Sequence, residues 1–217
     1  MSARASLATA LVTVWLTLSG AASAQQAAAD SASSSKSKPK TEAHVKASAP
    51  EGESVNGRYR NTTYGFTYRT PFGWVDRTRQ MQEEGTDPAK AQLLLAVFER
   101  PPEATGDTVN SAVIIAAESA GSYRGLKTAA DYMGPLTEVT TSKGFKVTRG
   151  PYAFRVGPKQ LVRGDFAKNL GTLTMYQSSL AYLEKGFVVS FSFIAGSEEE
   201  VEELIEKLTF GIAARPR

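Results

Sequence analysis

Apolar and polar residues alternate most regularly near the C-terminal end of the chain. Phe187–Ala195 places aromatic or branched residues at every second position, which predicts a strand with one fully apolar face. The segment 172–183 has the composition of a partner strand, and Glu184-Lys185-Gly186 between the two is typical of a tight turn. We therefore predict a long β-hairpin over residues 172–195.

The rest of the chain predicts further strands of two kinds. Residues 58–60 and Phe66–Arg69 flank a turn at 61–65, which indicates a short hairpin. Residues 92–99 and 112–118 are apolar without clean alternation, as expected of strands that are covered on both faces. Three more strands are predicted downstream, divided by Gly-Pro pairs: 145–149, 152–156 and 159–167.

Two helices are predicted among these strands. Residues 126–142 place apolar side chains at helical spacing, and Gly134-Pro135 is expected to kink or break this helix. Near the C-terminus, Ser197 is positioned to cap a second helix, with Glu200 completing a capping box. Gly211 is expected to end that helix. Its apolar stripe is predicted to consist of Val201, Leu204, Ile205 and Leu208.

The N-terminal segment has the pattern of an export signal. Arg4 precedes a short apolar run at 7–18, and the small residues that follow predict cleavage between Ala24 and Gln25. The run is shorter than the roughly 20 apolar residues that a membrane-spanning helix needs. We therefore predict a signal peptide over residues 1–24, and a periplasmic or secreted mature protein without a transmembrane segment. Retention of the segment as an anchor is the alternative.

Composition divides the remaining residues into a linker, one domain and a short tail. Residues 25–57 are rich in Ala, Ser, Lys, Pro and Glu and nearly free of large apolar side chains, so we predict a disordered low-complexity linker. Residues 58–211 have the length of one ordinary domain. Residues 212–217 are predicted to be a disordered C-terminal tail.

The residue types available argue against most kinds of catalytic and metal site. The chain has no cysteine, and its single histidine, His44, lies in the predicted linker. A histidine-independent site would need paired carboxylates or an activated Ser-Lys pair. The carboxylates of the predicted domain are scattered, and the Ser-x-x-Lys matches all lie in the linker. We therefore predict no catalytic residue, no metal and no cofactor.

The charge pattern indicates a docking surface rather than a nucleic-acid site. The net charge is only +3, without the concentrated basic patch of a nucleic-acid binder. Residues 143–168 are nevertheless strongly basic, and adjacent strands can gather such side chains on one face. Arg149, Arg155, Lys159 and Arg163 are the predicted partner surface, for an envelope protein or an anionic envelope polymer. The alternative is that they are solvated outer positions of half-buried strands.

The domain resembles PsbP-like domains at both ends. The similar residues are Tyr59-x-Asn61-x-x-Tyr64-Gly65-Phe66-x-Tyr68, then Pro71-x-Gly73-Trp74, and finally Lys207-Leu208-Thr209-Phe210 after an acidic helix. The resemblance spans most of residues 58–211. It implies an α+β fold in which an antiparallel β-sheet is sandwiched between helices, together with a non-enzymatic accessory or adaptor role. It supplies no catalytic residues.

These patterns together predict an exported, non-enzymatic interaction or assembly module of the bacterial cell envelope. A second hypothesis is a periplasmic protein that binds a small ligand in a cleft between the sheet and the broken helix near Gly134-Pro135. A third is a hydrolase that works without histidine, which requires two carboxylates to converge in a cleft.

Overall fold

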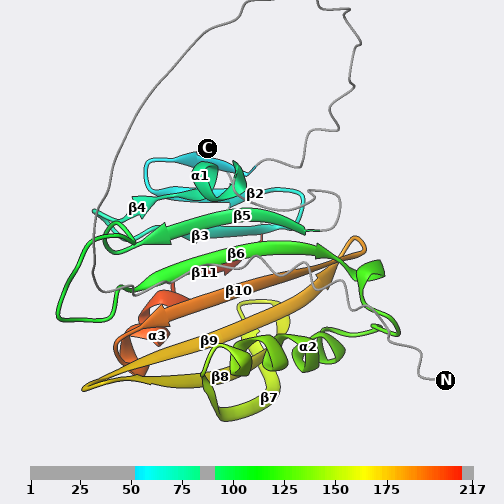
Figure 1. The fold of residues 1–217 in the computed structure, drawn as a ribbon. Helices are drawn as coiled ribbons and strands as arrows, with labels where there is room; N and C mark the ends of the chain where they lie inside the picture. The colour runs from blue at the N-terminus through cyan, green and yellow to red at the C-terminus, as the bar shows by residue number, and fades with distance from the viewer. Residues whose placement is uncertain (1–51, 84–90, 212–217) are drawn as a thin grey trace, which may run out of the picture. The chain divides into compact units, whose positions relative to one another are not determined.

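The computed structural model describes residues 52–83 and 91–211, whose strands form two antiparallel sheets (Figure 1). The larger sheet has seven strands, in the order β4 (Val75–Asp76), β5 (Ala91–Phe98), β6 (Ala112–Ser119), β10 (Phe187–Ala195), β9 (Leu173–Glu184), β8 (Lys159–Leu170) and β7 (Lys146–Val156). The smaller sheet has four, in the order β1 (Glu53–Val55), β2 (Arg58–Asn61), β3 (Phe66–Arg69) and β11 (Leu208–Phe210). The helices are α1 (Thr78–Glu83), α2 (Ala129–Ser142) and α3 (Glu198–Ile205), with a 3-10 turn at Ala120–Ser122.

The hairpin predicted from the clearest alternation is confirmed as β9 and β10. β10 begins and ends at the predicted residues, and β9 lies within one residue of its predicted bounds. Lys185 and Gly186 form the turn with φ angles of 50° and 80°. Two-residue hairpin turns of this kind need positive φ at both positions, which glycine adopts without strain.

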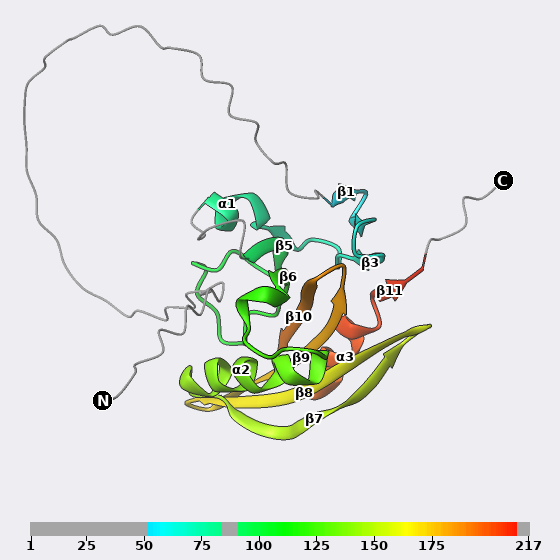
Figure 2. The same ribbon diagram turned by 90° about the vertical axis from the view of Figure 1, so that its right-hand side faces the viewer.

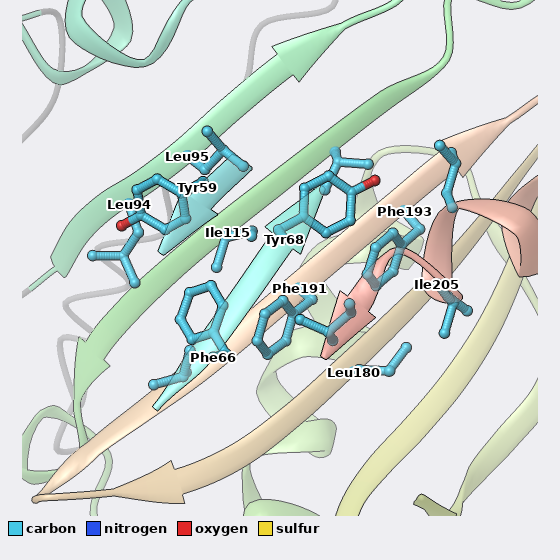
Figure 3. Packing of buried hydrophobic residues seen from close by; sticks show 14 of the residues in the cluster. Tyr59, Phe66, Tyr68, Leu94, Leu95, Ile115, Leu180, Phe191, Phe193 and Ile205 are labelled. Atoms are coloured by element: carbon cyan, nitrogen blue, oxygen red, sulfur yellow. The ribbon is translucent and has the colours of Figure 1, made fainter. Parts of the chain in front are cut away.

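The largest group of buried side chains lies between the two sheets (Figure 3). Phe66 of β3 packs edge-on against Phe191 of β10, with ring centroids 5.1 Å apart. Tyr68 lies next to Phe193, with ring centroids 6.1 Å apart. The Tyr182 hydroxyl of β9 donates a hydrogen bond of 2.7 Å to the backbone carbonyl of Tyr64. The aromatic residues at the start of the domain therefore attach the smaller sheet to the larger one.

The larger sheet is covered on both faces, because alternate residues of β10 enter different clusters. Val189 and Phe191 belong to the core that includes the apolar side of α3, whereas Val188 packs with Met133 and Leu136 of α2. α2 lies across β8 and β9 (Figure 1). An α+β fold with helices on both sides of an antiparallel sheet is thus confirmed. The predicted short hairpin is present as β2 and β3, but its place in a second sheet with β1 and β11 was not predicted.

The structure joins two predicted strands, 145–149 and 152–156, into the single strand β7. The pairing register between β7 and β8 shifts on both sides of Arg149, so Gly150-Pro151 is accommodated as an irregularity within one strand. β7 is an edge strand of the larger sheet. A proline is tolerated at an edge because its missing N–H removes no ladder hydrogen bond.

The predicted break in the first long helix is wrong. α2 is one helix that contains Pro135, and it begins at Ala129 rather than at 126. Thr128 caps it by accepting a hydrogen bond from the Asp131 N–H, and the Asp131 carboxylate accepts one in return from the Thr128 N–H. Pro135 removes one backbone hydrogen bond, but buried side chains on both sides of it, such as Met133 and Leu136, hold the helix on the sheet.

The second predicted helix is confirmed as α3, with two corrections. Ser197 caps it by accepting a hydrogen bond of 3.1 Å from the Glu200 N–H. The capping box is incomplete, because the Glu200 carboxylate accepts from the Gly196 N–H and the Ser111 hydroxyl instead. The helix ends at Ile205 rather than at Gly211, since Leu208–Phe210 form β11 beside β3.

Several predictions fall partly or wholly outside the described residues. These are the signal peptide at 1–24, its cleavage between Ala24 and Gln25, most of the linker and the tail at 212–217. β1 at Glu53–Val55 lies inside the predicted linker, 25–57, so strand pairing begins before the predicted domain start. Within the described ranges, no helix combines the length and the apolar character needed to span a bilayer.

Candidate functional site

A groove of about 280 Å³ lies between α3 and the outer strands of the larger sheet. β7, β8 and β9 form one wall and α3 forms the other; Figure 2 shows β7 and β8 curving past α3. The polar side chains around which the groove is built are Arg149, Tyr152, Arg163, Asp165, Ser178 and Glu202.

Strand register explains why these residues meet. Arg163 and Asp165 are two residues apart on β8, so both side chains point to the face that carries α3. Tyr152 of β7 is paired with Arg163, and Ser178 of β9 is paired with Asp165. Glu202 follows the buried Val201 on α3 and is exposed, so it completes the group from the other wall.

The Arg163 guanidinium is the centre of a closed hydrogen-bond network. Its Nε donates to Asp165 Oδ1 over 2.7 Å, its Nη1 to Glu202 Oε2 over 3.0 Å, and its Nη2 to Ser178 Oγ over 3.0 Å. Nη2 also binds the second oxygen of Glu202. Asp165 Oδ1 accepts from the Ser178 hydroxyl over 2.5 Å, and Oδ2 accepts from the Tyr152 hydroxyl over 3.0 Å. We call these five side chains the Arg163 network.

The electrostatics of the network favour the charged form of Arg163. Burial alone disfavours that charge, but hydrogen bonds and charges from Glu202 and Asp165 outweigh it and raise the pKa of the guanidinium. Burial is also the main reason that the pKa of Tyr152 is raised to about 12, with Arg163 lowering it and Asp165 adding to the increase. The network therefore holds one cation and two carboxylates, and the tyrosine keeps its proton at neutral pH.

The structure separates the four residues of the predicted partner surface. Arg163 is 6% exposed and bonded within its network, so it is not available as an exposed docking residue. Lys159 lies over the ring of Tyr182, 4.5 Å from its centroid, and pairs with Glu184 over 2.8 Å. Arg149 and Arg155 of β7 are exposed. By strand register Arg149 is on the α3 side of the sheet and Arg155 is on the α2 side, so the four do not share a face.

The groove has the geometry of a structural clamp rather than of a catalytic pair. Two carboxylates do converge there, Asp165 and Glu202, but the Arg163 guanidinium lies between them and binds both. Each Asp165 oxygen already accepts from a neighbouring side chain, which leaves neither placed as a base. Among residues 52–83 and 91–211, no three His, Asp or Glu side chains cluster in a way that could hold a metal ion.

The cleft expected beside Gly134-Pro135 is filled by side chains. Met133 and Leu136 are buried there against Phe166, Ala181 and Val188 of the sheet. An open hollow of about 330 Å³ lies instead near the start of α2, lined by Ala129 together with residues 159–162 and 182–183. Its lining is mainly apolar and contains one charged side chain, Lys159, which is already paired.

Comparison with known proteins identifies solved structures with a similar fold. No family model matches the chain, and no curated protein matches it. The chain is similar to the cyanobacterial PsbP protein CyanoP of Synechocystis sp. PCC 6803, with 14% identity and a TM-score of 0.47 over 76% of this chain and 95% of that one. It is also similar to LpqN of Mycobacterium tuberculosis, a protein involved in cell envelope biogenesis, with 14% identity and a TM-score of 0.39 over 67% of this chain and 83% of that one. A PsbP protein is thus among the similar structures, as the sequence resemblance implies, and at this identity the likeness concerns the fold alone.

Sequence reasoning missed Asp165, Ser178, Tyr152 and Glu202 as members of one cluster. Asp165 is the one acidic residue within 143–168, and that isolation among cations was the available signal of an internal ion pair. Glu202 gave no such signal, because it is one of six glutamates in and just after α3. Only the packing of α3 on β9 and β10 shows which glutamate reaches Arg163 of β8.

Proposed function

We propose that this chain is an exported, non-enzymatic interaction module of the bacterial cell envelope that docks an acidic partner protein along β7. The observation that carries the proposal is the charge of this edge strand. Lys146, Arg149 and Arg155 are exposed on it, and none of them has a carboxylate within ion-pair distance among the described residues. The export signal predicted at 1–24 supports a location outside the cytoplasm.

The construction of β7 favours docking through side chains over the addition of another strand. The strand has register shifts on both sides of Arg149, and Pro151 interrupts its backbone donors. Irregularities, prolines and charges of this kind protect an edge from pairing with a foreign strand. The cations that protect the edge also provide complementary charge for an acidic partner, which directs its encounter and orientation.

The Arg163 network supports a binding role without catalysis. Its carboxylates, hydroxyls and guanidinium are bonded to one another, so they fix β7, β8, β9 and α3 in place. Arg149 lies on the rim of this clamp with its guanidinium carbon 4.2 Å from the centroid of the Tyr152 ring. Stacking of this kind orients an exposed arginine and reduces the entropy that it loses on binding.

Crosslinking in intact cells tests the proposal. The full chain, tagged at its C-terminus, is crosslinked and recovered, and its adducts are identified by mass spectrometry. We expect one dominant protein adduct from the wild type and its loss from the double variant Arg149→Glu with Arg155→Glu.

The matched control reverses two exposed charges elsewhere, Arg124→Glu with Lys127→Glu before α2. The control has the same net charge as the β7 variant and should keep the adduct, and far-UV circular dichroism should show both variants folded. Absence of any specific adduct contradicts the proposal, as does an adduct that survives the β7 substitutions or disappears equally in the control.

A further inference from the structure

The outer face of the smaller sheet carries a row of basic side chains on three neighbouring strands. Arg58 of β2 is paired with Arg69 of β3, and the Arg69 N–H donates to the Lys207 carbonyl over 3.1 Å, which places Lys207 next in line. Tyr59 and Tyr68, the adjacent pair, point into the core, so Arg58 and Arg69 point away from it. Lys207 precedes β11, and its Nζ donates a hydrogen bond of 3.1 Å to the Glu203 carbonyl of α3. Neighbouring strands are roughly 5 Å apart. We call Arg58, Arg69 and Lys207 the basic row.

This row is unfavourable for the isolated protein. Like charges directly opposite each other on neighbouring strands repel and destabilise a sheet. No carboxylate lies within ion-pair distance of Arg58, Arg69 or Lys207 in the part of the chain that the structure describes. Glu53, the acidic residue on this face of β1, is paired across the strands with Arg60 rather than with the row. Arg58 and Arg69 therefore present uncompensated positive charge to their surroundings.

Exposed apolar side chains flank the row at the same end of the sheet. Val55, half exposed, is paired with Arg58 at one end of the row. Phe72, fully exposed, lies in the turn that follows Arg69. These are two of the three large apolar side chains that are exposed in the described residues, and the third, Val147, is on β7.

The turn that carries Phe72 is held in a defined conformation. The Trp74 N–H donates to the Pro71 carbonyl over 3.4 Å, and Gly73 has a φ of +83°, which a turn of this type requires at its third position. Trp74 packs against the core between the sheets, so the turn is attached to the domain while the Phe72 ring faces outward. An outward aromatic ring beside arginines is the pairing found on proteins that bind at a membrane interface.

We propose that the basic row and Phe72 form a docking site for the surface of an anionic lipid bilayer. Arg58 and Arg69 contact the negatively charged headgroups, with Lys207 adding positive charge beside them, while Phe72 and Val55 enter the boundary between headgroups and acyl chains. Charge complementarity selects this occupant, because the row attracts an extended anionic surface. The flanking apolar side chains are also transferred from water into the apolar part of the bilayer, which is favourable. An acidic protein surface would satisfy the arginines but would need an added apolar pocket for Phe72, whereas a bilayer interface supplies both. The inference goes beyond the proposed function, because it concerns another face of the molecule and a lipid partner.

Vesicle flotation of residues 25–217, the chain without its predicted signal peptide, tests this site. Vesicles contain either phosphatidylcholine alone or phosphatidylcholine with 30% phosphatidylglycerol. We expect binding to the anionic vesicles only, and a fall in affinity of about 30-fold for Arg58→Thr with Arg69→Thr, since each basic residue near an anionic surface contributes about fivefold. Phe72→Ser should weaken binding to the anionic vesicles, and 0.5 M salt should abolish it.

The matched control is Arg149→Thr with Arg155→Thr on β7, which removes the same charge from exposed strand positions elsewhere. It should bind within about twofold of the wild type. Threonine is favoured in strands and removes the repulsion between Arg58 and Arg69, so the row variant should fold at least as stably as the wild type. The proposal is overturned by no binding to anionic vesicles, by equal binding to neutral ones, by equal losses in the control, or by binding to polyglutamate without binding to vesicles. These outcomes leave the β7 crosslinking result unaffected, so the two proposals fail separately.

Discussion

At the scale of single residues, Arg163 connects more of the fold than any neighbour in its groove. Its guanidinium binds Asp165 on its own strand, Ser178 on β9 and Glu202 on α3. It also lies 4.9 Å from the centroid of the Phe154 ring on β7. When one partner of a buried ion pair is removed, the remaining partner is left desolvated and uncompensated. The resulting loss of stability is larger than the net stability that the intact pair contributes.

We expect Arg163→Met to lower the free energy of unfolding by about 3 kcal/mol, because Asp165 loses its ion-pair partner in a largely buried place. Glu202→Gln should lower it by less than about 1 kcal/mol, because Glu202 is half exposed and water replaces its interactions. Urea denaturation with unchanged m-values measures both effects. Equal effects of the two substitutions would show that Arg163 is not the centre of the network.

A second residue with an unusual environment is Glu118 on β6, which is 4% exposed. Its two carboxylate oxygens accept hydrogen bonds from the hydroxyls of Tyr132, over 2.6 Å, and Tyr123. Burial raises the pKa of Glu118 above its usual value, and the two tyrosine hydrogen bonds oppose that rise only in part. No cation pairs with it in the described residues.

This environment predicts a pH dependence of stability. A carboxyl whose pKa is higher in the folded state binds protons more tightly there, so its contribution to stability falls as pH rises from the usual glutamate value of 4.5 through the folded-state pKa. Glu118→Gln should abolish that fall. The free energies of unfolding of variant and wild type, measured between pH 4 and pH 8, should therefore diverge in favour of the variant as pH increases. Parallel profiles would contradict the assigned direction of the pKa.

At the scale of elements, α2 and the β9–β10 turn use glycine in opposite ways. Gly134 is within α2 without a positive φ, and a Cβ atom there would meet nothing within 4 Å beyond the backbone of its own helix and its two chain neighbours. Gly186 has a φ of +80°, which side chains other than glycine rarely adopt. The first glycine therefore weakens its helix, and the second is required by its hairpin.

We expect Gly134→Ala to raise the free energy of unfolding by about 0.5–1 kcal/mol and Gly186→Ala to lower it by about 1 kcal/mol. Thermal unfolding should show shifts of roughly 2–4 °C in opposite directions. The result for Gly134 tests the correction made to the sequence prediction: a loss of stability there would mean that α2 is interrupted at Gly134-Pro135.

Elements with a regular pattern over many residues were predictable, and short or irregular ones were not. β10 and α3 repeat their period over whole elements, so sequence alone located them. β11 has only three residues, Leu208–Phe210, and depends on pairing with β3. β7 continues through Gly150-Pro151 because it has a partner on one side only, which the sequence does not show.

The candidate site was less predictable than the fold for a related reason. Alternation along β8 does place Arg163 on one face, but it does not say what covers that face. The partners of Arg163 come from β7, β9 and α3, at separations of up to 39 residues. Burial and pairing of a single side chain depend on these long-range contacts, and periodicity carries no information about them.

At the scale of the whole molecule, the two proposed docking surfaces both expose positive charge but differ in their surroundings. The edge strand β7 combines Arg149 and Arg155 with an irregular backbone, which suits an acidic protein surface. The basic row combines Arg58 and Arg69 with the outward ring of Phe72, which suits a lipid surface. Taken together, the two proposals would have the module bring a partner protein to a membrane.

Site-specific photocrosslinking in intact cells tests the central claim, that β7 is the partner-docking edge, most directly. A photoreactive amino acid replaces exposed Ala153 on β7 in one strain and exposed Thr141 on α2 in another. We expect a discrete protein adduct from position 153 upon illumination and none from position 141. An adduct from position 141 alone, or equal adducts from both positions, would contradict the assignment of β7 as the docking edge.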